Sequence, residues 1–296
     1  MLRAHWIFLL LLGLLPFSAH ATQVMLDMRP NLPAAAEYQV GARDKPAVLL
    51  LHGFLQTRES PTVTALAHGL TDAGYSVLTP TLTLGIPGRR QSLACEAVHN
   101  NSLDDDLAEI DRWVKWLRDK GHRRIVLIGH SFGSLQLLAY LSGKPDPAVT
   151  GFVGISLVEA QIGGLPRAPL IERLTAQVAR NDRNLVNYPL SYCGKYPTTP
   201  EALLSYVRRD QARTLTALHQ LGDRSLLVMG SADDRMTQGW LRALQHLQTP
   251  LVVIDGGNHF MDGEHEFDLL EHTLAFLQSG ARAASPHTQS SVAQLQ

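Results

Sequence analysis

The chain has 296 residues but only two cysteines, Cys95 and Cys193, and it contains no close grouping of cysteine and histidine. It also lacks the His-Glu-x-x-His pattern that binds zinc on a helix, and it has no glycine-rich nucleotide fingerprint. We therefore expect no metal and no cofactor. The two cysteines could pair with each other in an oxidising compartment.

Long blocks of charge of one sign are absent as well. The 26 lysines and arginines nearly balance the 27 aspartates and glutamates. Nucleic acids and anionic membrane surfaces bind clusters of basic side chains, so this balance gives no reason to expect either as a partner. The sequence leaves the oligomeric state open.

The chain has no hydrophobic run long enough to span a bilayer. The longest, residues 6–17, is about a dozen residues, against the roughly 20 that a transmembrane helix needs. Arg3 precedes this run, and the small-x-small pattern Ala19-His20-Ala21 follows it, which is typical of a cleaved signal peptide. No cysteine follows the run, which argues against a lipid anchor. We expect residues 1–21 to be removed on export, leaving a periplasmic or secreted protein without a stable membrane anchor.

Alternating strand and helix patterns fill most of the remaining chain. Continuous apolar runs typical of strands buried on both faces occur at residues 47–51, 124–129 and 225–229, with helical periodicity between such runs. This alternation predicts an α/β fold with a mostly parallel central sheet covered by helices on both faces. We expect the sheet domain to comprise residues 22–158 and 223–279, and the small, polar residues 280–296 to form a disordered tail.

The alternation stops between residues 159 and 222. Helix-like stretches lie around residues 170–178 and 201–221, and a polar middle at residues 181–199 has no clear periodicity. We interpret residues 159–222 as a lid or cap inserted into the sheet domain, with an irregular middle.

The strongest chemical signal is Gly129-His130-Ser131-Phe132-Gly133, placed between a buried strand and a helix. A sharp strand-to-helix turn lifts the serine hydroxyl above the sheet, and the glycines let the backbone pass through the crowded turn. The helix that follows points its N-terminus at the site and favours negative charge there. The position after a buried strand makes Ser131 a candidate nucleophile rather than an incidental turn residue.

Backbone amides that could stabilise an oxyanion follow the first buried strand, at His52-Gly53-Phe54. Acyl transfer develops negative charge on a carbonyl oxygen, and amides aimed at that oxygen stabilise the transition state. We expect the donors to be the amides of Phe132 and Phe54, with Leu55 as the alternative to Phe54.

A histidine and a carboxylate follow the last two predicted strands. His259 lies on the glycine-rich stretch Gly256-Gly257-Asn258, where it could act as a base near neutral pH. Asp233 or its neighbour Asp234 could orient that histidine, and Glu159, after an earlier strand, is a third candidate. Asp233 is the preferred candidate.

The order Ser131, Asp233, His259 resembles that of the α/β-hydrolase superfamily, in which each member of the triad follows a strand. The resemblance covers roughly residues 46–277. It implies Ser131 as nucleophile, Asp233 as acid, His259 as base, an oxyanion hole at Phe54 and Phe132, and a lid at the interruption. The loop after residue 79 reads TLTLGIPGRRQS and lacks the Asp-x-x-Gly-x-Gly-x-Ser pattern of many lidded members.

A serine in this position supports an acyl-enzyme, so the predicted function is hydrolysis of a carboxylic ester, thioester or amide of a small-molecule acyl substrate. An acyltransferase would share every one of these residues. A catalytically silent binding protein on the same fold is the alternative from another class, and the presence of all three triad residues argues against it. Acyl-chain length does not follow from the sequence, because the predicted lid mixes apolar and polar residues.

The two cysteines are predicted to form a disulfide that ties the lid to the core. Cys95 lies in the long loop after the strand at residues 75–79, and Cys193 lies in the middle of the lid segment. Both segments should lie over the carboxyl edge of the sheet, and export would allow the bond to persist.

Overall fold

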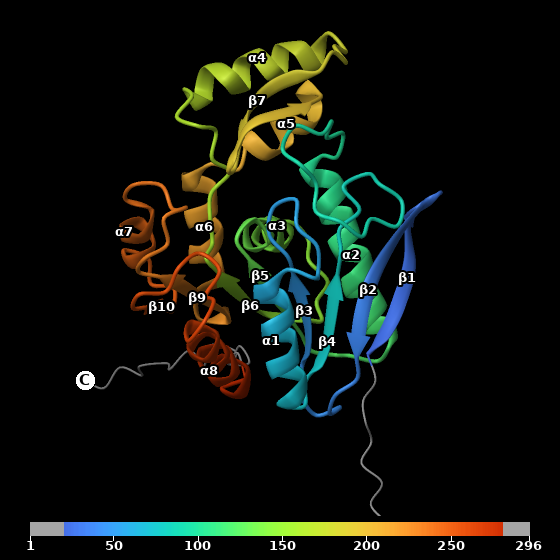
Figure 1. Cartoon of the computed structure of the whole chain (residues 1–296), viewed down its shortest axis with the longest axis vertical. Helices are drawn as coiled ribbons and strands as arrows, with labels where there is room; N and C mark the ends of the chain where they lie inside the picture. Colours follow the sequence, from blue (N-terminus) through green and yellow to red (C-terminus); the bar gives the residue numbers. More distant parts are fainter. Residues whose placement is uncertain (1–20, 281–296) are drawn as a thin grey trace, which may run out of the picture.

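The computed structural model describes residues 21–280, so most of the predicted signal peptide and nearly all of the predicted tail lie outside the described residues. An eight-stranded sheet forms the centre, in the order β1-β2-β4-β3-β5-β6-β9-β10 (Figure 1). The strands from β4 to β10 run parallel, and the hairpin β1–β2 joins them antiparallel. The bounds are β1 Thr22–Arg29, β2 Leu32–Gln39, β3 Ala47–Leu51, β4 Ser76–Pro80, β5 Ile125–His130, β6 Val149–Ile155, β9 Ser225–Gly230 and β10 Leu251–Ile254. The predicted α/β fold with a mostly parallel sheet is confirmed.

The strands are continuously apolar because each buries both of its faces. Along β3, Leu49 and Leu51 contribute to one hydrophobic core, and Val48 and Leu50 contribute to the other. Helices α1 and α8 cover the second core, and α2, α3 and α6 lie on the opposite side of the sheet (Figure 1). The helices are α1 Pro61–Asp72, α2 Leu103–Asp119, α3 Phe132–Leu141, α6 Gln211–Leu221, α7 Trp240–Gln245 and α8 His265–Gln278. No helix among residues 21–280 is long and apolar enough to cross a bilayer.

The hairpin β1–β2 carries no clear signal in the sequence. Strand β1 is an edge strand whose residues are mostly exposed, so it has no continuous apolar run. Strand β2 reads LPAAAEYQ, and alanine has a low strand propensity. Tertiary packing against β4 therefore decides this hairpin.

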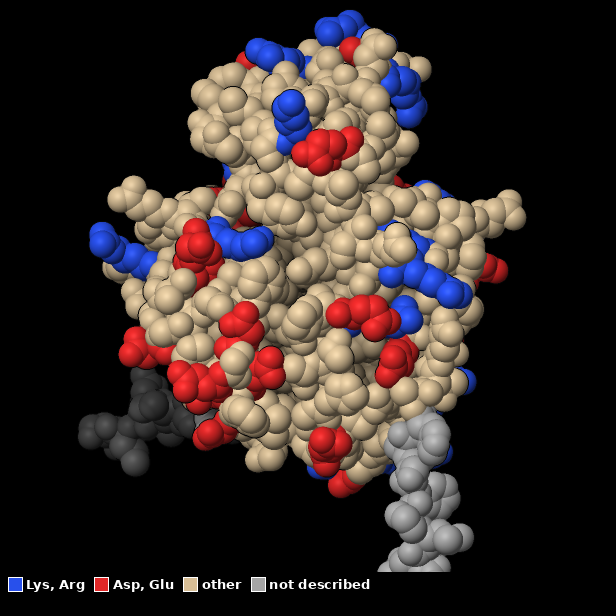
Figure 2. All heavy atoms as spheres, in the orientation of Figure 1, with Lys and Arg blue, Asp and Glu red and all other residues tan. Residues whose placement is uncertain are grey.

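The predicted lid segment, residues 159–222, divides into two parts. Helix α4 (Arg167–Ala179), strands β7 (Val186–Leu190) and β8 (Cys193–Thr198), and helix α5 (Pro200–Val207) stand above the sheet, whereas α6 lies beside α3 in the body (Figure 1). We call residues 167–207 the head. Helix α5 ends before Asp210, and α6 begins after it. Asp210 caps the N-terminus of α6, because its carboxylate accepts a hydrogen bond from the Arg213 amide at 2.9 Å. On the face shown in Figure 2, most of the surface of the head is uncharged, and basic side chains predominate among its charged ones.

The prediction that residues 181–199 are irregular is wrong, because β7 and β8 form an antiparallel hairpin there. The segment contains proline, asparagine and glycine, and its two strands do not alternate cleanly between buried and exposed positions. A disulfide and contacts with the body stabilise the hairpin. These long-range interactions leave no periodic pattern of apolar residues in the sequence.

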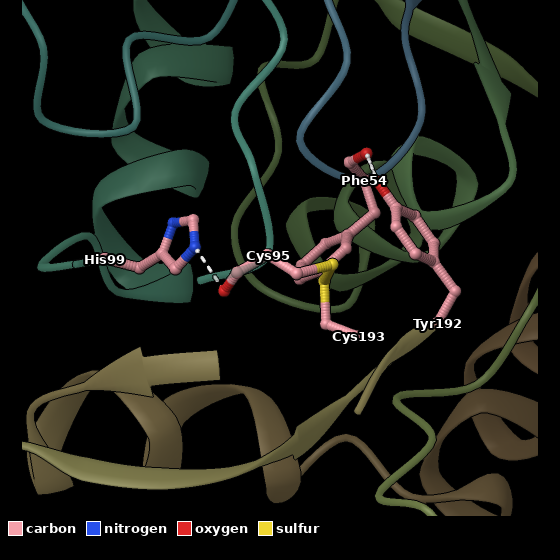
Figure 3. Close-up of a disulfide and its surroundings, with 5 residues drawn as sticks. All are labelled: Phe54, Cys95, His99, Tyr192 and Cys193. Atoms are coloured by element: carbon pink, nitrogen blue, oxygen red, sulfur yellow. Dashed lines mark hydrogen bonds between the residues drawn. A yellow bond between two sulfur atoms is a disulfide. The ribbon is translucent and has the colours of Figure 1, made fainter. Parts of the chain in front are cut away.

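Several ties connect the head to the body, three of them through residues 95–106. A disulfide joins Cys95 to Cys193, with their Cα atoms 5.4 Å apart (Figure 3). His99 donates its backbone N–H to the Pro197 carbonyl at 2.8 Å, and its ring stacks on Tyr196 with 4.2 Å between centroids. The head is therefore attached to the loop between β4 and α2 as well as through its own chain connections.

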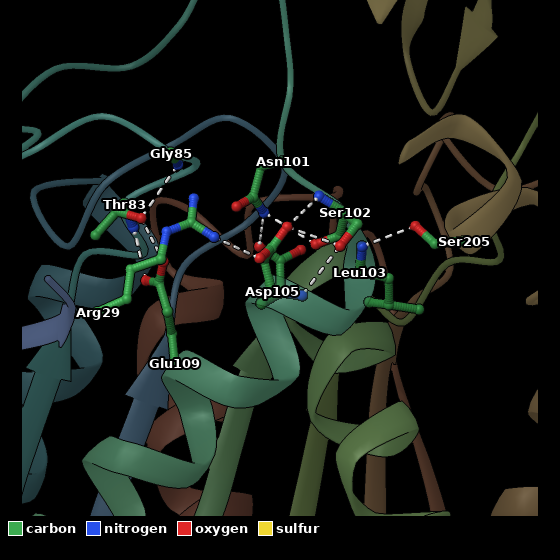
Figure 4. Close-up of polar contacts among 10 residues, drawn as sticks. Arg29, Thr83, Gly85, Asn101, Ser102, Leu103, Asp105, Glu109 and Ser205 are labelled. Atoms are coloured by element: carbon green, nitrogen blue, oxygen red, sulfur yellow. Dashed lines mark hydrogen bonds and ion pairs between the residues drawn. The ribbon is translucent and has the colours of Figure 1, made fainter. Parts of the chain in front are cut away.

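The third tie lies at the start of α2. Ser102 and Asp105 form a capping box there (Figure 4). The next amide, of Leu103, donates to the Ser205 hydroxyl on α5 at 2.8 Å. One turn further along α2, the buried Asp106 accepts a hydrogen bond from the Tyr206 hydroxyl at 2.7 Å.

Candidate active site

Ser131 lies at the sharp turn between β5 and α3. Its backbone adopts φ 56° and ψ −124°, a conformation that a residue with a side chain rarely takes. The amide of Ser131 donates to the Ile155 carbonyl of β6 at 2.7 Å, which fixes the turn to the neighbouring strand. The conformation places the hydroxyl at the carboxyl edge of the sheet, where its side chain faces His259.

The two glycines that flank this serine are required by close packing. A Cβ atom on Gly129 would lie 2.6 Å from the Ser134 amide nitrogen. A Cβ atom on Gly133 would lie 2.3 Å from the His52 carbonyl oxygen. Any side chain at either position would push the turn away from its neighbours, so the G-x-S-x-G spacing follows from the geometry.

Ser131, His259 and Asp233 form a chain of hydrogen bonds. The Ser131 Oγ lies 2.8 Å from His259 Nε2, and His259 Nδ1 lies 2.9 Å from Asp233 Oδ2 and 3.0 Å from Asp233 Oδ1. All three residues are buried. With a proton on Nδ1, the histidine donates to the carboxylate and presents the lone pair of Nε2 to the serine hydroxyl.

Close contact between two loops brings the histidine and the carboxylate together. A Cβ atom on Gly230 would lie 2.0 Å from the Gly257 carbonyl oxygen, so only glycine allows this approach. The Ala232 amide donates to that same Gly257 carbonyl at 3.0 Å. The loops after β9 and β10 are therefore joined directly beside Asp233 and His259.

The structure distinguishes the three candidate acids. Only Asp233 contacts His259, and its Oδ1 also accepts the Arg235 amide at 2.9 Å. Asp234 is exposed. Glu159 accepts a hydrogen bond from the Thr237 hydroxyl at 3.0 Å and makes no contact with the histidine.

Phe54 and Phe132, the predicted oxyanion donors, lie side by side, with ring centroids 4.7 Å apart. Phe132 is the first residue of α3, where a helix has no internal acceptor for the amide. The Phe54 carbonyl accepts a hydrogen bond from the Tyr192 hydroxyl of the head at 3.1 Å (Figure 3). The neighbouring Leu55 has φ 57°, so the backbone turns sharply at this point.

The buried side chain of Arg89 stabilises the loop that contains Phe54 and Leu55. The side chain is only 4 % exposed, and it donates hydrogen bonds to the carbonyls of Leu55 at 3.3 Å and Gln56 at 2.7 Å. It also donates to the carbonyls of Leu82 at 2.8 Å and Gln91 at 2.9 Å. Burial lowers the pKa of Arg89 to about 10, so the guanidinium stays charged at neutral pH. Nothing in the sequence pattern distinguishes Arg89 from the exposed Arg90 beside it.

Two buried histidines fix the backbone around the site. His52 Nε2 accepts the Leu82 amide at 3.1 Å, so its Nδ1 carries the proton and donates to the Gly53 carbonyl at 2.9 Å. His130 Nε2 donates to the His259 carbonyl at 2.9 Å. Burial is the main cause that lowers the pKa of His52 to about 3 and that of His130 to about 4, so both rings are neutral at pH 7.

A family model described as the alpha/beta hydrolase family matches residues 48–271. The chain belongs to the alpha/beta hydrolase family. Membership supports hydrolase activity, and the match spans β3 to α8, including every residue of the hydrogen-bonded chain at Ser131. No curated protein matches this hydrolase.

Solved structures share the fold of this alpha/beta hydrolase at low sequence identity. A monoacylglycerol lipase from Paleococcus ferrophilus is 19% identical with a TM-score of 0.61, covering 83% of this chain and 98% of that chain. An esterase from Pyrococcus furiosus is 19% identical with a TM-score of 0.57, and the match covers 88% of this chain and 92% of that chain. Est1E from Butyrivibrio proteoclasticus is 15% identical with a TM-score of 0.59, covering 87% and 99%.

Proposed function

We propose that the chain is an exported serine hydrolase that cleaves carboxylic esters through an acyl-enzyme on Ser131. The observation that carries the proposal is the 2.8 Å contact between Ser131 Oγ and His259 Nε2, with Asp233 against the other ring nitrogen. A serine hydroxyl is a weak nucleophile by itself, and a hydrogen-bonded imidazole can remove its proton during attack. The similar structures include an esterase and a monoacylglycerol lipase, which agrees with this class of substrate.

In the proposed reaction, Ser131 Oγ attacks the ester carbonyl carbon while its proton passes to His259 Nε2. The resulting oxyanion accepts hydrogen bonds from the amides of Phe54 and Phe132. When the tetrahedral intermediate collapses, His259 returns the proton to the departing alcohol. Water then attacks the acyl carbon and gives a proton to His259, which passes it to Ser131 Oγ as the ester bond to the serine breaks and the carboxylic acid product leaves. Asp233 keeps the imidazole oriented and stabilises its cationic form.

The head is proposed to act as a fixed wall of the substrate site. Its Tyr192 contacts the Phe54 carbonyl, and its Tyr206 ring lies 5.8 Å from that of Phe132. The disulfide and the contacts with α2 restrict how far this segment can move away. Export is supported by the same disulfide, because such bonds persist in oxidising compartments.

The test is a panel of p-nitrophenyl esters of rising acyl length with wild type, Ser131→Ala and His259→Ala. We expect hydrolysis by wild type and losses of several orders of magnitude in kcat for both variants, because the triad acts as a unit. A fluorophosphonate probe should label wild type and fail to label Ser131→Ala. Ser142→Ala, at the other end of α3, is the matched control and should keep full activity. Activity that survives in folded Ser131→Ala would overturn the proposal.

A further inference from the structure

Arg235 places a positive charge beside the proposed catalytic residues. Its guanidinium carbon lies 4.9 Å from the ring centroid of Phe260, the residue that follows His259. The same atom lies 5.3 Å from the ring centroid of Tyr192. Tyr192 belongs to the head and hydrogen-bonds the Phe54 carbonyl, so Arg235 contacts both the body and the head next to the site.

The position of this side chain is fixed through its backbone. The Arg235 amide donates to Asp233 Oδ1 at 2.9 Å, and the Arg235 carbonyl accepts a hydrogen bond from Gln161 Nε2 at 2.7 Å. Both partners lie at the carboxyl edge of the sheet, one of them in the proposed triad. Backbone hydrogen bonds therefore fix Arg235 beside the site, and the residue remains exposed to solvent.

The guanidinium has no carboxylate partner among residues 21–280, and its nitrogen atoms make no hydrogen bond there. Asp233 faces His259, and the adjacent Asp234 forms no ion pair within the described chain. Aromatic contacts stabilise the cation through its charge but leave its N–H donors free. An arginine in this state can bind a planar anion with two parallel hydrogen bonds.

The head carries a small excess of positive charge. The head, residues 167–207, contains five lysines and arginines and three acidic residues, although the whole chain has a formal net charge of −1. Figure 2 shows basic side chains gathered on the head. The charge of Arg235 also reaches the site itself: burial is the main cause that lowers the pKa of His130, and Arg235 lowers it further, whereas the charge of Asp233 raises it.

We infer that Arg235 binds an anionic group on the substrate, so that the preferred esters carry a carboxylate near the bond that is cleaved. This inference rests on the proposed function, because it assigns the substrate class of the Ser131 site. Arg235 is then a specificity residue that selects among esters, and no chemical step passes through it.

The test compares kcat/KM for charged and neutral esters that are otherwise matched. Mono-p-nitrophenyl glutarate and its methyl ester place the carboxylate on the acyl side, and 4-acetoxybenzoate and its methyl ester place it on the leaving group. Wild type should prefer the charged member of at least one pair. Arg235→Gln should lower that charged-to-neutral ratio by about 10- to 100-fold, the range expected for the loss of a hydrogen bond to a charged group. Arg235→Glu should lower it further.

Arg112→Gln replaces an exposed arginine on α2; it is the matched control and should leave the ratio unchanged. Rising salt should reduce the preference of wild type and should have little effect on the ratio of Arg235→Gln. A purely structural role would change both members of a pair equally and leave the ratio intact, which would overturn the inference. So would a wild type without preference in either pair. Failure of the Ser131 proposal looks different, because Ser131→Ala would then still hydrolyse the neutral esters.

Discussion

Three non-glycine residues with positive φ lie within the proposed site: Leu55 at 57°, Ser131 at 56° and Met261 at 50°. Each such conformation costs roughly 1–3 kcal/mol and persists only where the surroundings impose it. Leu55 follows the proposed oxyanion donor Phe54, and Met261 lies two residues after His259. Each of the three segments that carry the proposed machinery therefore contains one residue in this costly conformation.

Replacing Asp233 by Asn should lower kcat by about 10⁴-fold, because the amide lets the imidazole adopt the wrong tautomer. Asp234→Asn is the matched control and should change kcat little, since Asp234 is exposed and does not contact His259. The measurement is steady-state hydrolysis of a p-nitrophenyl ester by both variants. Equal losses in the two variants, or a larger loss in Asp234→Asn, would contradict the assignment of the acid.

Replacing Arg89 by Met should lower kcat with a smaller effect on KM. The substitution removes the donors to the Leu55 and Gln56 carbonyls and releases the loop that carries the Phe54 amide. The oxyanion exists only in the transition state and the tetrahedral intermediate. The loss of a group that stabilises it therefore lowers kcat more than it weakens substrate binding. The variant should also unfold at a lower temperature, because its former carbonyl partners are buried without donors.

Arg89→Lys keeps the charge but not the fork of donors, so it should recover stability better than kcat. Arg90→Met is the control, because Arg90 is exposed one residue along the same loop. Kinetics and thermal unfolding are measured on the same preparations. If Arg89→Met lost stability but kept the kcat of wild type, the residue would serve only the fold.

At the scale of elements, one buried carboxylate connects α2 to α3 and to the head. Asp106 accepts hydrogen bonds from Gln136 Nε2 and the Tyr206 hydroxyl, both at 2.7 Å, and from Asn101 Nδ2. Burial outweighs these hydrogen bonds and raises the pKa of Asp106 to about 7, against an ordinary value of 3.8. The contact between helix α5 and the body therefore includes a group that titrates near neutral pH.

The sign of the resulting pH dependence follows from proton binding. Between about pH 4 and 7 the folded state keeps a proton on Asp106 that the unfolded chain has released, so this group lowers the free energy of unfolding as the pH rises. Asp106→Asn removes the titration. The unfolding free energy of the variant minus that of wild type should then rise from pH 4 to 7 and level off above 7.

Denaturant unfolding of the two proteins across this pH range is the measurement. The difference between them removes the contributions of His52 and His130, because these groups titrate alike in both. Their lowered pKa values act in the opposite direction, since the unfolded chain takes up protons below about pH 6.5 that the folded state does not. A difference that stays constant from pH 4 to 8 would show that Asp106 does not titrate as described.

At the scale of the whole molecule, the disulfide closes a loop across 98 residues, from the segment after β4 to the hairpin of the head. Closing a loop of this length stabilises a folded chain by about 4–5 kcal/mol on the chain-entropy model. The double variant Cys95→Ser/Cys193→Ser should lose stability of this order. Hydrogen exchange in β7 and β8 should also become faster, because the hairpin loses one of its attachments to the body.

Two measurements check this prediction. Thiol titration of denatured, unreduced protein from an oxidising compartment should find no free thiols. Reductant should lower the stability of wild type toward that of the double variant, and it should leave the variant itself unchanged, which serves as the control. Two free thiols per chain would refute the bond in the protein as isolated.

Much of the fold and site could be predicted from the sequence, because the signals involved are local. Continuous apolar strands such as residues 47–51 have to be covered on both faces, which determines the layered sheet. The glycines around Ser131 and beside His259 mark turns that only glycine can pass, and they are visible without coordinates. The order Ser131, Asp233, His259 then identifies the family and the residues that we propose as catalytic.

Tertiary structure decided those features that depend on a distant partner and leave no pattern in the sequence. The contact of His259 with Asp233, and not with Asp234, follows from the approach of two loops at Gly230 and Gly257, which no sequence pattern shows. The hairpins β1–β2 and β7–β8 form through pairing and packing that their own residues do not favour. The environments of Arg89 and Arg235 are invisible in the sequence, since burial, hydrogen bonds and aromatic contacts exist only once the chain has folded.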